Sequence, residues 1–169
     1  LEFSIKDPKI TFPLLRFQEE HNRRAAEIRA AKAAEEAGAD ALLVVSPYYN
    51  KATQDGLVTQ YSTVAASVHI PVIVYNVPSR TGLDIPVSVY QCLSQIPNIA
   101  GVKEASTDIS KIAKIKAACP EDFSVWSGND DQTAAVISLG GSGVISVLSN
   151  VVPVETQAMC RAALAGDFD

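Results

Sequence analysis

The stretch Ile99-Ala100-Gly101-Val102-Lys103-Glu104-Ala105 is apolar up to its last residues and carries one lysine near its carboxyl end. This pattern is typical of a short buried strand, where an unpaired ammonium group would lose much of its favourable hydration. Burial lowers the pKa of a lysine and so makes its free amine available as a nucleophile toward carbonyls. Two interpretations stand: Lys103 is a catalytic amine, or it emerges at the strand end and extends to water.

A pattern of helix followed by strand repeats on both sides of this stretch. Continuous apolar runs predict buried strands at 41–45, 71–75, 99–103, 123–126 and 143–147. Helical patterns lie at 23–37, after the N-cap candidate Asn22, and at 55–67, 86–94, 108–118, 131–139 and 154–164. The alternation predicts an α/β fold with a parallel sheet, either doubly wound or a (β/α) barrel. No GxGxxG follows a strand and no GxxxxGK[ST] occurs, so the nucleotide-binding motifs are absent from the sequence.

The composition is that of a globular protein without nucleic-acid or metal signatures. Of 169 residues, 47% are hydrophobic and 20% charged, and the net charge of −5 argues against a nucleic-acid surface. With three widely spaced cysteines and two histidines, we expect free thiols and no metal site. With no signal peptide and no apolar run long enough for a bilayer, we expect a cytoplasmic protein that does not contact membranes. Residues 1–21 have no clear period and receive no function.

Polar and small residues collect where the predicted strands end. They are Tyr49, Tyr75, Arg80, Lys103, Gly128 and Ser146. In a barrel the active site is assembled from several strand ends of this kind. A lysine can form an imine with a ketone, a phenol can move protons, and an arginine can hold a carboxylate through two hydrogen bonds. A glycine lets a substrate approach the backbone.

Each of these residues also has a structural interpretation. Tyr75 could be a core aromatic whose hydroxyl finds a partner, and Arg80 could be an exposed turn residue. Tyr48 and Tyr49 could pack locally or form an interface patch. Their common place at the end of successive strand–helix units favours the catalytic interpretation.

Five segments resemble the dihydrodipicolinate synthase family, within the pyruvate-dependent class I aldolases that include N-acetylneuraminate lyase. They are Pro47-Tyr48-Tyr49-Asn50, Tyr75-Asn76-Val77-Pro78-Ser79-Arg80-Thr81-Gly82, Gly101-Val102-Lys103-Glu104-Ala105, Ser127-Gly128-Asn129-Asp130 and Gly143-Val144-Ile145-Ser146. The lysine and the strand-end tyrosine are common to the whole group. The Ser79-Arg80-Thr81-Gly82 loop points to the synthase branch.

The resemblance implies a (β/α)8 barrel and a lyase of lysine and diaminopimelate biosynthesis. Lys103 would form a Schiff base with pyruvate, and the enamine would add to aspartate semialdehyde without any further cofactor. Tyr75 would relay protons, and Arg80 would hold the carboxylate of the aldehyde substrate.

The resemblance also assigns three further positions and an assembly. Gly128 and Ile145 would line the pyruvate pocket. Tyr49 would reach across a tight dimer interface into the site of a second copy, so a homo-dimer or homo-tetramer is expected.

The resemblance covers residues 22–169 as a partial barrel, strands four to eight of the family, and leaves 1–21 unassigned. The loop with the relay threonine that joins the two tyrosines is absent, and a full barrel takes about 250 residues. A truncated chain, a degenerate relative and a half-barrel completed by another subunit are three explanations. The expected function is therefore a synthase-type condensation, weak or absent in this chain alone. The alternatives are a sibling aldolase for sugar acids and a non-catalytic homologue.

Overall fold

The computed structural model of the chain describes residues 24–47 and 52–168. Its strands are β1 (Leu42–Val45), β2 (Val72–Asn76), β3 (Ile99–Glu104), β4 (Ser124–Ser127) and β5 (Gly143–Val144). Its helices are α1 (Arg24–Glu36), α2 (Gln54–Ala65), α3 (Pro78–Thr81), α4 (Val87–Leu93), α5 (Ser110–Ala118), α6 (Thr133–Ser138) and α7 (Pro153–Leu164), with 3-10 turns η1 (Asp130–Gln132) and η2 (Leu148–Asn150). The predicted N-cap Asn22, the segment 1–21 and Tyr49 lie outside the described residues.

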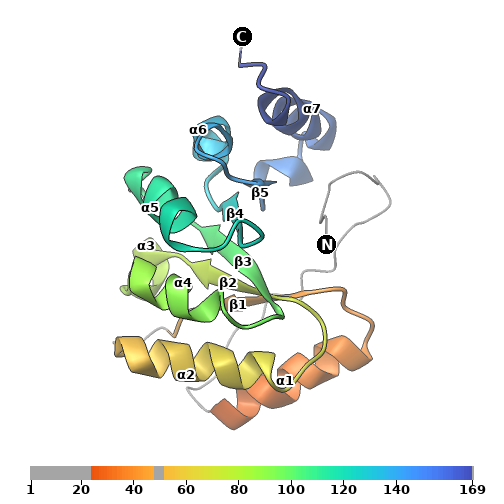
Figure 1. The fold of residues 1–169 in the computed structure, drawn as a ribbon. Coiled ribbons are helices and arrows are strands. Elements are labelled where there is room, and N and C mark those ends of the chain that lie inside the picture. Colours follow the sequence, from red (N-terminus) through yellow and green to blue (C-terminus); the bar gives the residue numbers. More distant parts are fainter. Residues whose placement is uncertain (1–23, 48–51, 169) are drawn as a thin grey trace.

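The five strands form one parallel sheet in the order β1-β2-β3-β4-β5. Because the chain advances in one direction across the sheet, right-handed crossovers place the helices on one face. Figure 1 shows this arrangement, with α1 and α2 below the sheet and the later helices following an arc past α4 and α5 to α7. A doubly wound sheet would reverse its strand order and carry helices on both faces. The order therefore selects the barrel type, and the predicted partial barrel of five parallel strands is confirmed.

The two faces of the sheet carry different side chains. The outer face, under the helices, contributes residues such as Val74, Val102 and Val125 to the main apolar core. A second cluster occupies the inner face, which would line the interior of a barrel: Leu43, Ile73, Tyr75, Val77, Ala105 and Trp126. Successive residues of a strand point to opposite faces, so strands buried on both faces read as the continuous apolar runs seen in the sequence.

The segment after β2, which the sequence analysis treated as a loop at Ser79-Arg80-Thr81-Gly82, forms a short helix. Asn76 is the last residue of β2, and Pro78–Thr81 form the short helix α3. Proline suits the first turn of a helix because its missing N–H has no intrahelical partner there. Gly82 ends the turn with a φ of 69°, a left-handed conformation that glycine adopts without a steric penalty.

The last strand is shorter than the predicted range 143–147. Only Gly143 and Val144 form β5, and the Ile145 N–H still donates to the Ser127 carbonyl at 3.0 Å. The N–H groups of Val147 and Leu148 do not extend the ladder, because both donate to Asp130 Oδ2 at 3.1 Å. A side chain thus takes over the backbone donors and ends the strand.

None of the helices in the described ranges has the length and apolar character needed to cross a bilayer.

Candidate active site

The carboxyl ends of all five strands share one edge of the sheet, because the strands are parallel. Tyr75 is the last residue but one of β2, and Lys103 is the last residue but one of β3. The two are register partners on neighbouring strands. The sheet therefore brings together the two residues to which the sequence assigns imine chemistry and proton transfer.

Lys103 and Tyr75 are in direct contact on the inner face. The Lys103 Nζ lies over the face of the Tyr75 ring, 4.5 Å from its centroid. Each residue is only 8% exposed. Trp126 is the register partner of Lys103 on β4, so the amine is flanked by an aromatic side chain on each neighbouring strand. Of the two interpretations of Lys103, the one in which it extends into bulk water is wrong.

Gly101 makes room for this arrangement. Its φ of +155° is disfavoured for other residues, and a Cβ at this position would lie 2.0 Å from the Ser124 carbonyl oxygen and 2.9 Å from the Trp126 ring. Glycine is therefore required where β3 and β4 approach each other, two residues before Lys103.

Gly128 and Ile145 lie beyond the ends of β4 and β5. The Gly128 N–H donates to the Glu104 carbonyl at 2.7 Å, and a Cβ on Gly128 would lie 2.5 Å from the Cβ of Ala105. Ile145 packs against the inner-face cluster. Both residues thus border the inner face at the end where Lys103 lies.

Arg80 lies on α3, after β2, and its side chain is exposed. It is therefore carried by the short helix that follows β2, whereas Tyr75 and Lys103 are carried by the paired strands themselves. An exposed guanidinium at the strand-end edge is free to meet a carboxylate arriving from solvent. Tyr49, the remaining predicted site residue, lies outside the described residues.

Asp130 is a residue at this edge that sequence reasoning left without a role. Its carboxylate accepts the N–H groups of Val147 and Leu148, and so joins the loop after β4 to the loop after β5. Partial burial would raise the pKa of Asp130, but hydrogen bonds from Ser146 and these N–H groups, with the charge of Lys103, hold its pKa below the ordinary value. The signal for Asp130 in the sequence was its position in the stretch 127–130, directly after a predicted strand.

Sequence reasoning also assigned no role to Asn76 and Glu104, the residues that follow Tyr75 and Lys103. Both are buried and point to the outer face of the sheet. Alternation of side chains along a strand was the signal that could have separated them from their neighbours.

The chain matches a protein family, and it is similar to known proteins in both sequence and structure. Residues 22–169 match the model of the dihydrodipicolinate synthetase family. A 4-hydroxy-tetrahydrodipicolinate synthase of Methylococcus capsulatus is 51% identical over 147 residues, which is 86% of this chain and 50% of the relative. The same-named protein of Alkaliphilus oremlandii is 46% identical over 142 residues, 84% of this chain and 49% of the relative.

Solved structures agree with the sequence matches. The dihydrodipicolinate synthase of Aquifex aeolicus superposes with a TM-score of 0.84 at 44% identity, over 87% of this chain and 50% of that one. The enzyme of Acinetobacter baumannii, described as chloride-inhibited and complexed with pyruvate, gives a TM-score of 0.83 at 40% identity, over 86% of this chain and 50% of that one. The chain spans about half the length of the relatives it matches. From the family match and these identities, the chain belongs to the dihydrodipicolinate synthetase family.

Proposed function

We propose that this chain carries the imine-forming half of a 4-hydroxy-tetrahydrodipicolinate synthase, a lyase that condenses pyruvate with aspartate semialdehyde. The observation that supports this most directly is the buried contact between the Lys103 Nζ and the Tyr75 ring at the carboxyl ends of β2 and β3. Burial disfavours the charged form of an amine, and the uncharged form is the nucleophile. The match to relatives named for this activity supports the same assignment.

The first half of the reaction would take place on Lys103. Its Nζ adds to the ketone carbon of pyruvate to give a carbinolamine, and loss of water from this intermediate gives an imine. The imine draws electrons from the neighbouring methyl group, which loses a proton to give an enamine. Tyr75, whose ring contacts the Lys103 Nζ, would supply and recover the protons of these steps through its hydroxyl. The imine itself is the electron sink, so the scheme needs no bound cofactor.

The second half would use the aldehyde substrate. The enamine carbon attacks the aldehyde of aspartate semialdehyde, which forms the new carbon–carbon bond and regenerates the imine. Water then hydrolyses this imine, which frees the Lys103 amine and leaves a ketone, and the amino group from aspartate semialdehyde condenses with that ketone to close the ring with loss of water. Arg80, exposed on α3, would hold the carboxylate of this substrate through paired hydrogen bonds. Gly128 and Ile145 would border the pyruvate.

Reduction with borohydride in the presence of pyruvate tests the proposal. A stable adduct is expected on the peptide that contains Lys103, and Lys103→Arg should abolish it while keeping the charge. Lys111, which is also buried but lies on the outer face, is an internal control for non-specific imine formation. Failure to label Lys103 would favour a non-catalytic homologue.

Self-association belongs to the same proposal. The relay tyrosine at position 49 would act in the site of a second copy, so activity should rise with protein concentration in the range where dimers form. One structural relative is described as a monomeric variant of the enzyme, so association has to be measured for this chain. We expect sedimentation to show dimers or tetramers, with weak condensation by the 169-residue chain alone, below about 1 s⁻¹.

A further inference from the structure

Each of the two central site residues is followed by a buried polar residue on the opposite face of the sheet. Asn76 follows Tyr75 on β2, and Glu104 follows Lys103 on β3. The two polar residues are register partners, as are Tyr75 and Lys103. The same two strands therefore present an amine and a phenol to the inner face and an amide and a carboxylate to the outer face.

Asn76 and Glu104 are joined directly and to the elements around them. The Asn76 Nδ2 donates to Glu104 Oε1 at 2.7 Å and to Asp84 Oδ1 at 2.7 Å, and Asn76 Oδ1 accepts from the Ile85 N–H at 3.1 Å. Glu104 Oε1 also accepts from the Ser106 N–H at 2.8 Å. These bonds tie β2 to β3 and to the chain that leaves α3.

The second carboxylate oxygen of Glu104 reaches two helices. Oε2 accepts from the Tyr90 hydroxyl of α4 at 3.0 Å and lies 3.3 Å from the Lys111 Nζ of α5. Lys111 also pairs with Asp84. Burial, with the charge and hydrogen bond of Glu104, raises the pKa of Tyr90 well above its ordinary value, so the phenol stays a donor to the carboxylate. We call Asn76, Asp84, Tyr90, Glu104 and Lys111 the outer polar cluster.

A stabilising role alone does not explain this cluster well. Glu104 is 2% exposed, and a buried ion pair is often no more stabilising than apolar residues of the same volume. What such a pair supplies is a single allowed arrangement, because any other leaves a charge or a donor without a partner. Here the arrangement that satisfies Glu104 also fixes the register of β3 against β2, and with it the contact of Lys103 with Tyr75.

We propose that Asn76 and Glu104 are positioning residues for the imine site: through the outer polar cluster they hold the Lys103 Nζ against the Tyr75 ring from the other side of the sheet. The inference rests on the proposed function, since positioning has a chemical use only if Lys103 forms the imine. A displacement of about 1 Å in a reacting group can cost about 100-fold in rate.

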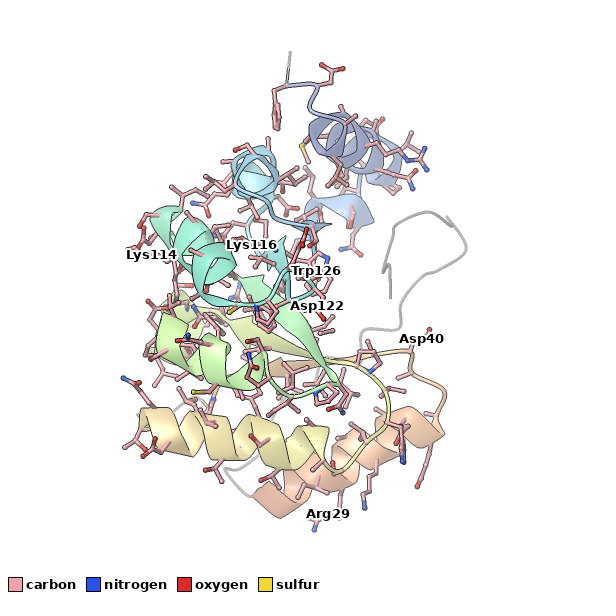
Figure 2. The ribbon with its side chains drawn as sticks, viewed as in Figure 1. Arg29, Asp40, Lys114, Lys116, Asp122 and Trp126 are labelled. Carbon is pink, nitrogen blue, oxygen red and sulfur yellow. The ribbon has the colours of Figure 1, made fainter. Side chains whose placement is uncertain are left out.

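The test compares Glu104→Gln with a matched control, Val102→Ala. Gln keeps an oxygen for Asn76 and Ser106 but loses the charge that faces Lys111. Val102 is fully buried on the same strand and the same face, two residues away, and has no part in the cluster. Figure 2 shows the exposed Lys114 at the outer side of α5, away from Trp126 on the strands, so Lys114 serves as the reference amine.

The first measurement needs no substrate. Acetic anhydride labels amines, and peptide mapping gives the rate at Lys103 relative to Lys114. We expect slow labelling of Lys103 in the wild type and in Val102→Ala, and a rate that approaches that of Lys114 in Glu104→Gln. Unchanged protection of Lys103 in Glu104→Gln would overturn the inference, whether or not Lys103 forms an imine with pyruvate.

The second measurement follows borohydride trapping with increasing pyruvate. Glu104→Gln should lower the trapping rate at saturating pyruvate by about ten- to 100-fold and leave the half-saturating concentration unchanged, because Glu104 does not face the pyruvate side. Val102→Ala should trap as the wild type does. An equal loss in both variants would mean a general structural effect and would overturn the inference. If Lys103 of the wild type is protected from anhydride as expected but pyruvate is never trapped on it, the proposed function is overturned instead.

Tyr90→Phe keeps the shape of the cluster and removes one hydrogen bond to Glu104, so it decides the matter if Glu104→Gln does not fold. We expect a smaller change in the same direction in both measurements. No change in either one would count against the positioning role.

Discussion

The Lys103 Nζ lies 4.5 Å from the centroid of the Tyr75 ring, and the two residues are register partners on β3 and β2. Both partners of the contact thus lie on paired adjacent strands, and neither lies on a loop. Sites built on paired strands hold their geometry more precisely than sites on loops.

The Tyr75→Phe variant separates the contribution of the Tyr75 hydroxyl from that of its ring. Tyr75→Phe keeps the aromatic contact with Lys103, so the fold and the anhydride protection of Lys103 should not change. The rate of imine trapping should fall by about 10²–10⁴-fold, the usual contribution of a proton-transfer group. Borohydride trapping with pyruvate over time measures this rate. Normal trapping by Tyr75→Phe would remove Tyr75 from the proton relay.

Gly101→Ala should be strongly destabilising. Its new Cβ would meet the Ser124 carbonyl, a backbone atom that cannot move aside, and we expect a loss of about 3 kcal/mol or more in the free energy of unfolding. Gly82→Ala is the matched control, because Gly82 also has a positive φ but has open space around it. That variant should lose about 1–2 kcal/mol from backbone strain alone. Urea denaturation measures both, and equal losses would contradict the close approach of β3 and β4.

Because the pKa of Asp130 is lowered, the free energy of unfolding should fall as the pH is lowered into the acid range. The pKa of Asp130 in the folded protein lies below the ordinary value of an aspartate, because hydrogen bonds from Ser146, Leu148 and Val147, with the charge of Lys103, outweigh its partial burial. A lowered pKa means that the stabilisation is fully present above pH about 4 and is lost as the pH falls through the folded-state value. Denaturation of the wild type and Asp130→Asn at pH 6 and at pH 3 should show a difference that shrinks in acid. A constant difference would contradict this role.

Arg80 should affect the second substrate and leave the first alone. Because Arg80 is exposed, Arg80→Ala should keep the stability within about 0.5 kcal/mol and leave pyruvate trapping unchanged. The aspartate semialdehyde concentration that halves trapping should rise by about ten- to 100-fold, as expected for a lost charged hydrogen-bond pair. Arg80→Lys should be intermediate, because it keeps the charge without the paired geometry. An unaltered aldehyde concentration would exclude Arg80 from carboxylate binding.

The sequence predicted the fold class because strands covered on both faces leave a clear apolar signature. The runs at 41–45 and 99–103 match β1 and β3 closely. It could not choose between a barrel and a doubly wound sheet, because that depends on strand order in space, which the structure shows to be sequential. The end of β5 was missed because a distant carboxylate, Asp130, captures the N–H groups that the strand would otherwise use.

The sequence named candidate residues for the site but not their contacts. Strand-end position singled out Lys103 and Tyr75, and the structure places them side by side. Glu104 received no role in the sequence analysis, since a charged residue at a strand end usually faces solvent. Its burial comes from partners on two other elements, Tyr90 of α4 and Lys111 of α5, which the alternation within β3 does not identify.

The alternation along β2 and β3 has a consequence for mutation and design. Deleting one residue upstream of Lys103 within β3 would turn the carboxylate toward the inner face and bury the amine beneath the helices, since a shift of one residue exchanges the two faces of a strand. The side chains on the inner face of the two strands and those of the outer polar cluster therefore change position together. A transplant of this site into another parallel sheet would need both dipeptides, Tyr75-Asn76 and Lys103-Glu104, kept in their present alignment.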